Sequence, residues 1–182
     1  AASDVYKRQV YVPNSSYRQI RNGRFMPHGV RSDVFYPEKT ERDDKFTFLW
    51  VGRDEPRKAL GRFILAFEKT CRKADCQAII HSDWRAETAK RTARYVRYKR
   101  DLPIIMTQME GNGHDELRKL YNRSDAYVCT SKAGAFELGI VEAMSCGVCP
   151  IVTDWTFMNE IPTNGVNGFL IPIEGKCKDH VV

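Results

Sequence analysis

Short apolar runs alternate with amphipathic and polar segments along most of the chain. The first run, residues 46–51, is rich in β-forming residues and is closed by Gly52, which predicts a buried strand. Residues 59–74 follow it, with apolar side chains spaced as on one face of a helix. These side chains belong to Leu60, Phe63, Ile64, Phe67 and Cys71.

The same alternation continues up to residue 171. Further strands are predicted at residues 78–80, 103–106, 126–129, 150–152 and 169–171. Further helices are predicted at residues 84–98, 115–122 and 138–146. Regular alternation of this kind is typical of an α/β fold in which helices cover both faces of a parallel sheet. We therefore predict a Rossmann-like, three-layer parallel sheet over residues 39–182, and we expect it to be truncated at its C-terminus.

The chain before residue 39 lacks such a pattern. Residues 1–9 show no apolar periodicity, and we interpret them as a leader foreign to the fold. Residues 10–38 are interrupted by three prolines and contain no long periodic segment, which predicts connecting chain rather than a packed element.

Composition narrows the class of protein further. Of the 182 residues, 42% are hydrophobic and 29% are charged, which is a globular composition. No apolar run approaches the roughly 18 residues of a membrane-spanning helix. The six cysteines are few for this length and no secretory signal precedes them, so we expect reduced thiols and a cytoplasmic location.

The positive charge is concentrated in one segment. Residues 85–100 contain seven Lys and Arg and one Glu, an excess that equals the net charge of +6 of the whole chain. The favoured interpretation is the solvated outer face of a helix. The alternatives are an anionic membrane surface, which would make the protein peripheral to a membrane, and a nucleic acid, which we do not expect as a partner.

Two strand ends carry residues suited to an anionic ligand, and ligands of such sheets bind at the carboxyl ends of the strands. After residues 46–51, Gly52 is followed by Arg53 and, at the mouth of the next helix, by Lys58. Two cations beside the free N–H groups of a helix N-terminus predict a phosphate or diphosphate site. The alternative is that both are ordinary solvated surface cations.

The second strand end is residues 130–138, where small side chains allow a ligand to approach the backbone. A helix begins near Leu138, and its N-terminus again favours an anion. Glu142 lies one turn into this helix, where its carboxylate is suited to accept hydrogen bonds from ligand hydroxyls. The alternative is an exposed helical Glu in a favourable position in the helix dipole. No metal site is predicted, because the histidines are scattered and the single C-x-x-C pair at residues 146–149 has no second pair.

An ordered series of motifs resembles the C-terminal domain of GT-B glycosyltransferases, in particular the retaining group 1, or family 4, enzymes. The matching strings are FLWVGRDEPRKALGRFILA at residues 48–66, LYNRSDAYVCTS at residues 120–131, FELGIVEAMSCGVCPIVTD at residues 136–154, and the connector between residues 26 and 37. The resemblance covers nearly all of residues 10–172. It implies that residues 10–38 are the end of an N-terminal domain and the interdomain linker, and that residues 39–182 bind a nucleotide-sugar.

The resemblance also implies a reaction and a set of roles. A sugar would pass from a UDP- or GDP-linked donor to an acceptor hydroxyl with retention, without cofactor or metal. Arg53 and Lys58 would contact the diphosphate and Glu142 the ribose, while base contacts are expected near Met106. The amides around Gly134, Ala135, Phe136 and Leu138 would contact the distal phosphate. The missing N-terminal domain would supply the acceptor site, so this chain alone is expected to be inactive.

One departure from the family's pattern affects the proposed chemistry. The family has two glutamates eight positions apart, but the position eight before Glu142 is Gly134. Glu137 stands where the family has glycine. Either Glu137 replaces the missing carboxylate as a catalytic residue, or the chain is a degenerate, non-catalytic nucleotide-sugar-binding module.

Overall fold

The structure is a computed structural model, and it describes residues 10–12, 23–83, 101–109, 113–134 and 136–173. Within them, six strands form one sheet in which every pair is parallel. The strands are β3 (Phe46–Val51), β4 (Cys76–Ser82), β5 (Ile104–Gln108), β6 (Ala126–Cys129), β7 (Cys149–Thr153) and β8 (Phe169–Ile171). The prediction of a parallel α/β sheet is confirmed.

The order of the strands across the sheet is β5-β4-β3-β6-β7-β8. The chain builds β3, β4 and β5 outward in one direction, and then returns to add β6, β7 and β8 on the other side of β3. The direction of winding therefore reverses between β3 and β6. Open α/β sheets bind their ligands at such a switch point, at the carboxyl ends of the strands.

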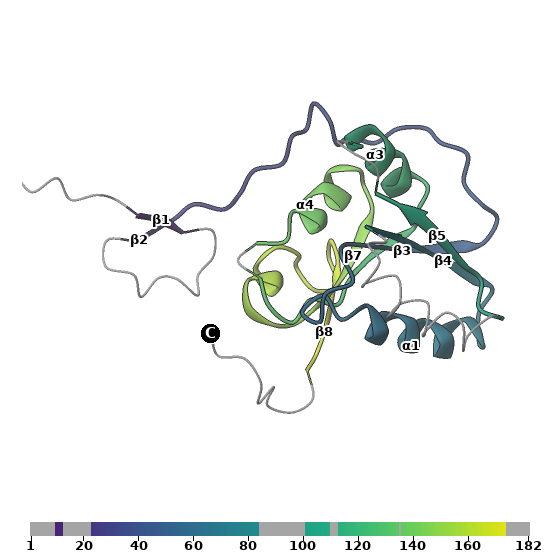
Figure 1. The fold of residues 1–182 in the computed structure, drawn as a ribbon. Helices are drawn as coiled ribbons and strands as arrows, with labels where there is room; N and C mark the ends of the chain where they lie inside the picture. The colour runs from purple at the N-terminus through teal and green to yellow at the C-terminus, as the bar shows by residue number, and fades with distance from the viewer. Residues whose placement is uncertain (1–9, 13–22, 84–100, 110–112, 135, 174–182) are drawn as a thin grey trace, which may run out of the picture.

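Helices lie on both faces of this sheet (Figure 1). Helix α1 (Leu60–Cys71) lies on one face, and helices α3 (His114–Asn122) and α4 (Leu138–Ser145) lie on the other. A 3₁₀ helix, η2 (Thr156–Glu160), follows β7. None of the helices in the described part of the chain is both long and apolar enough to cross a bilayer.

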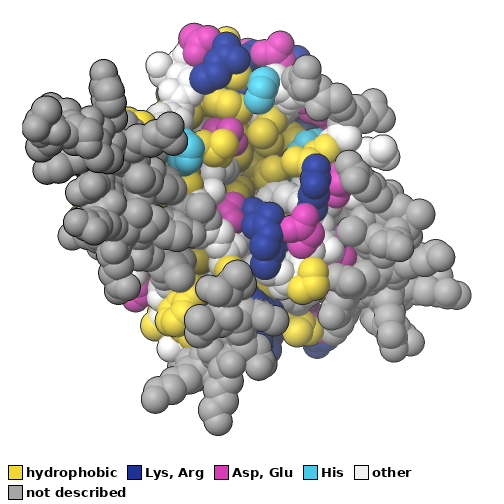
Figure 2. All heavy atoms as spheres, turned by 60° about the vertical axis from the view of Figure 1, so that its left-hand side comes forward, with side chains coloured by type: hydrophobic (Ala, Val, Ile, Leu, Met, Phe, Trp, Pro, Cys, Tyr) yellow, Lys and Arg dark blue, Asp and Glu magenta, His cyan; other side chains and the backbone are white. Residues whose placement is uncertain are grey.

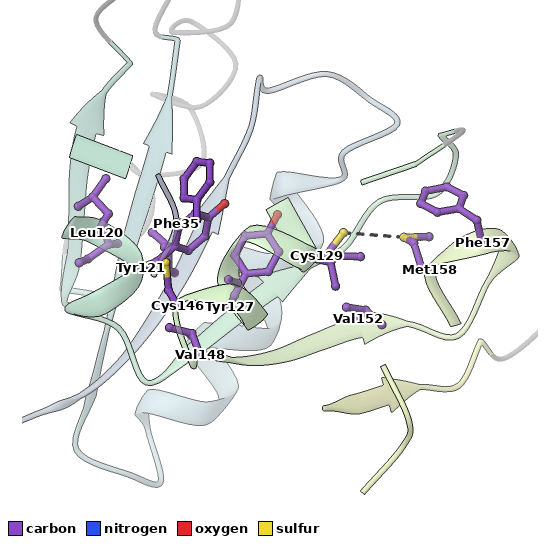
Figure 3. Close-up of a cluster of buried hydrophobic side chains, with 14 residues drawn as sticks. Phe35, Leu120, Tyr121, Tyr127, Cys129, Cys146, Val148, Val152, Phe157 and Met158 are labelled. Carbon is purple, nitrogen blue, oxygen red and sulfur yellow. Dashed lines mark hydrogen bonds between the residues drawn. The ribbon is translucent and has the colours of Figure 1, made fainter. Parts of the chain in front are cut away.

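Alternating side chains of the central strands fill two separate cores. Leu49 and Ile79 point to the α3–α4 face, whereas Trp50 and Ile80 point to the α1 face. This division follows from the two-residue period of a strand, and it explains why β3 and β4 are apolar on both sides. Figure 3 shows the larger core, which joins side chains from α3, β6, β7 and η2.

Strands β3, β6 and β8 have the predicted boundaries, and the boundaries of the other elements in the described residues differ from the prediction by at most three residues. Helix α1 begins at Leu60 rather than at residue 59 because Ala59 has a left-handed backbone conformation, with a φ of 52°. Strand β4 is longer than the predicted apolar triplet, since His81 and Ser82 continue its pairing with β5. The helix predicted at residues 84–98, with the basic segment, lies outside the described residues.

Residues 10–38, predicted as connecting chain, contain two features that the sequence analysis did not predict. Strands β1 (Val10–Val12) and β2 (Gly23–Phe25) pair in parallel as a small separate sheet. Phe35 is buried in the larger core against Tyr121, with 6.0 Å between the ring centroids. The backbone N–H of Glu38 donates to Asn122 Oδ1 at 2.7 Å. Residues 35–38 are therefore anchored to the domain, which a single aromatic residue between prolines did not reveal.

Candidate functional site

The loops after β3 and β6 meet at the switch point, where they are hydrogen-bonded to each other. The hydroxyl of Thr130 donates to the carbonyl of Lys58 at 2.8 Å, and the N–H of Lys132 donates to the carbonyl of Arg57 at 2.7 Å. Trp50 Nε1–H donates to the same Thr130 hydroxyl at 3.2 Å. The two segments predicted separately from the sequence therefore form one site.

Gly52 starts the first of these loops and is required by its conformation. Its φ of 154° lies in a region that residues other than glycine rarely adopt. Its N–H still donates to the carbonyl of His81 on β4, at 3.0 Å. The chain thus leaves β3 while held to the next strand, which places Arg53 beside the end of β4.

Lys58 and Glu137 come from opposite loops and form an ion pair at the centre of the site. Lys58 Nζ donates to Glu137 Oε2, and Arg57 Nη1 lies 3.8 Å from Glu137 Oε1. The side chains of Lys58 and Glu137 are 15% and 8% exposed, so both charges are largely removed from water. The Coulomb attraction within such a pair is stronger than within an exposed pair, but the removal of both charges from water opposes it.

Gly134 leaves room for this carboxylate. A Cβ at position 134 would lie 3.1 Å from Glu137 Oε1 and 3.3 Å from Phe157 Cζ. The carboxylate of Glu137 therefore occupies space beside the backbone of residue 134, although the two residues are three positions apart. A side chain at position 134 and the present position of Glu137 would crowd each other.

Arg53 has a partner that the sequence reasoning missed. Arg53 Nε lies 3.3 Å from Oδ2 of Asp83, which directly follows β4. The Arg53 side chain is 58% exposed, whereas that of Asp83 is 16% exposed. Asp83 stands at the carboxyl end of β4, and it meets Arg53 because the sheet places β4 next to β3. On the face shown in Figure 2, Lys and Arg side chains likewise lie directly beside Asp and Glu side chains.

Glu142 lies on α4 and accepts a hydrogen bond from a residue of α3. The hydroxyl of Tyr121 donates to Glu142 Oε2 at 3.0 Å. Partial burial raises the pKa of the Glu142 carboxyl, while the hydrogen bond from Tyr121 and the charge of His114 act in the opposite direction. Complete burial raises the pKa of Tyr121 well above its ordinary value, so this phenol keeps its proton and remains a donor.

Both helices that begin at the site lack a side-chain cap. Neither Ala59 at the start of α1 nor Glu137 at the start of α4 caps its helix through a side-chain hydrogen bond. The first N–H groups of such helices need other partners, and together with the helix dipole they attract anions. The carboxylate of Glu137, at the N-cap position of α4, binds Lys58.

The remaining predicted site residues differ in their distance from the ion pairs and in their exposure. Phe136 stacks on Phe157 with 6.3 Å between ring centroids and contacts His28 of the connector at 5.1 Å. Leu138 is exposed at the start of α4. Met106 is exposed on β5, which is separated from β3 by β4, so the structure does not bring it against the ion pairs. Ala135 lies outside the described residues.

A hollow of about 350 Å³ lies elsewhere in the domain. It is lined by Val148 and Cys149 near the start of β7 and by Val166 and Phe169 near the start of β8. None of the predicted site residues lines it.

The structure gives no support for thiol or metal chemistry in the described residues. The buried thiol of Cys146 has its pKa raised by burial to about 11, which makes it a poor nucleophile or metal ligand at neutral pH. Across the described residues, no three His, Cys, Asp or Glu side chains come together as a metal site.

Comparison with known proteins identifies the family to which the chain belongs. Residues 33–179 match the family described as "Glycosyl transferases group 1", and the chain belongs to this family. This confirms the resemblance found in the sequence motifs. The six-stranded parallel sheet with its helices is the C-terminal domain of the GT-B fold, as the solved structures below also indicate.

Among the relatives is a probable sucrose-phosphate synthase of Thermosipho melanesiensis, 27% identical over 97% of this chain and 42% of that protein. The chain thus spans less than half the length of that relative. The C-terminal domain of the group 1 protein LpcC of Francisella tularensis is 25% identical, with a TM-score of 0.68 over 79% of this chain and 80% of that domain. The Anabaena protein HepE, solved in complex with UDP and glucose, is 18% identical and shares the fold, with a TM-score of 0.73 over 90% of this chain and 49% of its own.

Proposed function

We propose that this chain is the donor-binding half of a retaining glycosyltransferase. It would bind a nucleotide-diphosphate sugar, UDP- or GDP-linked, whose sugar is transferred to an acceptor hydroxyl. The observation that carries the proposal is the meeting of Arg53, Lys58 and two uncapped helix N-termini at the switch point of the sheet. That arrangement offers positive charge and N–H donors together, as a diphosphate requires.

The proposed chemistry uses these groups as electrostatic stabilisers. When the bond between the anomeric carbon and the diphosphate breaks, negative charge grows on the leaving diphosphate. The acceptor oxygen forms the new bond to the anomeric carbon, and its proton passes to the leaving diphosphate. Arg53, Lys58 and the amides at the start of α4 would stabilise that growing charge without a metal ion. Both fixed cations and helix amides act with little reorganisation, which favours catalysis in a site partly closed to water.

Glu137 and Glu142 would have different roles. The carboxylate of Glu142 would accept hydrogen bonds from the ribose hydroxyls. The carboxylate of Glu137, lying beside the backbone of Gly134, would act near the transferred sugar in place of a Glu at that position. The main support for the second role is this location, together with the burial of the carboxylate.

The acceptor would come from an N-terminal domain, for which the protein surface around the connector is the natural neighbour. We propose a cytoplasmic protein that does not transfer sugar as this chain alone. Peripheral contact with a membrane is the alternative to a solvated outer helix for the basic segment. The basic segment that motivates membrane contact lies outside the described residues.

Titration calorimetry with UDP, GDP and ADP tests the proposal. We expect micromolar binding of at least one nucleotide, and a loss of about 10- to 100-fold in each of Arg53→Ala and Lys58→Ala, since a hydrogen bond to a charged group contributes about 1.5–3 kcal/mol. Lys69→Ala is the control, because Lys69 is exposed in the last turn of α1, far from the site. Absence of nucleotide binding, with salt-sensitive binding of RNA or anionic vesicles instead, would contradict the proposal.

A degenerate binding module is the second candidate. Gly134 in place of a Glu and the neutralisation of Lys58 by Glu137 favour it. Transfer of sugar by the protein joined to its N-terminal domain, lost in Glu137→Gln, would exclude this candidate.

A further inference from the structure

Tyr121 is a buried phenol whose hydroxyl binds Glu142, one of the predicted site residues. It lies in the last turn of α3, and its side chain is fully buried. Its ring packs edge-on against Phe35 at 6.0 Å and against Tyr127 at 5.7 Å between centroids. Figure 3 shows the three rings side by side in the larger core. Because aromatic neighbours enclose the ring, its hydroxyl has a fixed position.

This hydroxyl has one proton, which it donates to Glu142 Oε2 at 3.0 Å. The other carboxylate oxygen, Oε1, has no hydrogen-bond partner among the described residues. A free Glu side chain rotates about three bonds. Glu142 is instead held at one oxygen, so that its second oxygen is presented as an acceptor from a rigid position.

The helix that carries Glu142 is itself seated on the two phenols. A Cβ added to Gly139 would overlap the hydroxyl of Tyr127 and would lie 3.3 Å from the hydroxyl of Tyr121. Only glycine therefore allows the first turn of α4 to lie this close to the two hydroxyls. Glu142 follows three residues later on the same helix, which aligns its carboxylate with Tyr121.

We propose that Tyr121 is a positioning residue that makes the site selective for a ribose diol. It would act through Glu142, by fixing Oε2 so that Oε1 accepts hydrogen bonds from the ligand's ribose hydroxyls. The inference rests on the proposed nucleotide-binding function and adds to it the residue that sets ribose recognition. Tyr121 itself does not contact the ligand.

The test compares ribose and 2′,3′-dideoxyribose forms of UDP, GDP and ADP by titration calorimetry. In Tyr121→Phe we expect about fivefold weaker binding of the ribose form that the unaltered protein prefers, and unchanged binding of its dideoxy form. Tyr127→Phe is the matched control, because Tyr127 is an equally buried phenol that makes no hydrogen bond to Glu142. Its preference for ribose should stay intact.

Further variants keep the test decisive. Glu142→Asp withdraws the carboxylate from Tyr121 and should lose the ribose preference too, so it replaces Tyr121→Phe if that variant does not fold. Adding Tyr121→Phe to Glu142→Ala should cause no further loss. The inference is overturned if Tyr121→Phe or Glu142→Asp keeps the full preference, or if both ligand forms weaken equally. Binding of no nucleotide by the unaltered protein would instead overturn the proposed function, and this inference with it.

Discussion

The two sides of the candidate site are held in place by different forces. On the cationic side, defined by Arg53 and Lys58, each cation is paired with a carboxylate from another loop, Asp83 or Glu137. On the carboxylate side, defined by Glu142 and Tyr121, an acid is held by a buried neutral phenol. The first side is organised by charge pairs, and the second by packing and one hydrogen bond.

This difference has consequences for how a ligand would bind. A diphosphate that reaches Lys58 would compete with Glu137 for the same ammonium group, so the ion pair has to be shared or exchanged. A ribose would meet a carboxylate that already has its position and a free oxygen. The cationic side therefore gains affinity from exchangeable charges, whereas the carboxylate side contributes selectivity through pre-organisation.

The largest expected effect is on the stability of the cationic side. Lys58→Ala leaves the buried Glu137 carboxylate without its main partner, and removing one member of a buried pair costs about 3 kcal/mol of unfolding free energy. Urea unfolding measures this loss. The double variant Lys58→Ala/Glu137→Gln should recover most of it, and Lys69→Ala should stay close to the original protein. Equal stabilities of Lys58→Ala, the double variant and Lys69→Ala would show that leaving Glu137 without Lys58 does not destabilise the protein.

On the carboxylate side the corresponding change is Gly139→Ala. The added methyl group overlaps the phenols beneath α4, and overpacking of this kind costs about 1–3 kcal/mol. Thermal and urea unfolding measure the effect. Gly29→Ala is the control, since a Cβ at position 29 would meet nothing within 4 Å. We expect the loss in Gly139→Ala to be smaller in Gly139→Ala/Tyr127→Phe, where the blocking hydroxyl is absent.

A third change has the opposite sign. Glu137→Gln removes the negative charge that occupies Lys58, so we expect the affinity for a free nucleoside diphosphate to rise about fivefold, or roughly 1 kcal/mol. Titration calorimetry measures this rise, with Glu55→Gln as the control because Glu55 pairs with Arg57 rather than with Lys58. A fall in affinity would mean that Glu137 supports the diphosphate site rather than competing with it.

The sequence allowed the fold to be predicted well, because its signals are local. The apolar runs at β3 and β6 and the periodic face of α1 each depend on a few consecutive residues, and all three were placed correctly to within a few positions. Parallel pairing followed from their alternation with helices. The burial of Phe35 could not be predicted in this way, because it depends on contacts with α3 more than 80 residues away.

The site was predictable in part. Arg53, Lys58 and the loop at residues 130–138 could be identified because they follow strands, and the structure brings them together. Their partners could not be assigned, since the pairing of Lys58 with Glu137 and of Arg53 with Asp83 depends on strand order. Tyr121 falls in the helix predicted at residues 115–122, but its hydroxyl gave no signal of its own.

The smallest expected effect is a dependence of ribose recognition on pH. Burial raises the pKa of Glu142, so its carboxylate takes up a proton at a higher pH than an exposed Glu does. The protonated form is a poorer acceptor, and affinity for the ribose form should therefore fall as the pH is lowered from 7.5 to 5.5. His114 opposes this fall, because a positive charge there favours the ionised carboxylate.

The diphosphate of the ligand also takes up a proton in this range, since the second pKa of a phosphate is about 6. The ratio of the affinities for ribose and dideoxyribose forms removes that contribution, because both ligands carry the same diphosphate. We expect this ratio to fall about two- to threefold across the pH range in the original protein. In Glu142→Gln, which cannot ionise, the ratio should be low and constant. A ratio that stays high and constant in the original protein would mean that Glu142 keeps its charge throughout, or that another group binds the ribose. A fall that persists in Glu142→Gln would show that the titrating group is not Glu142.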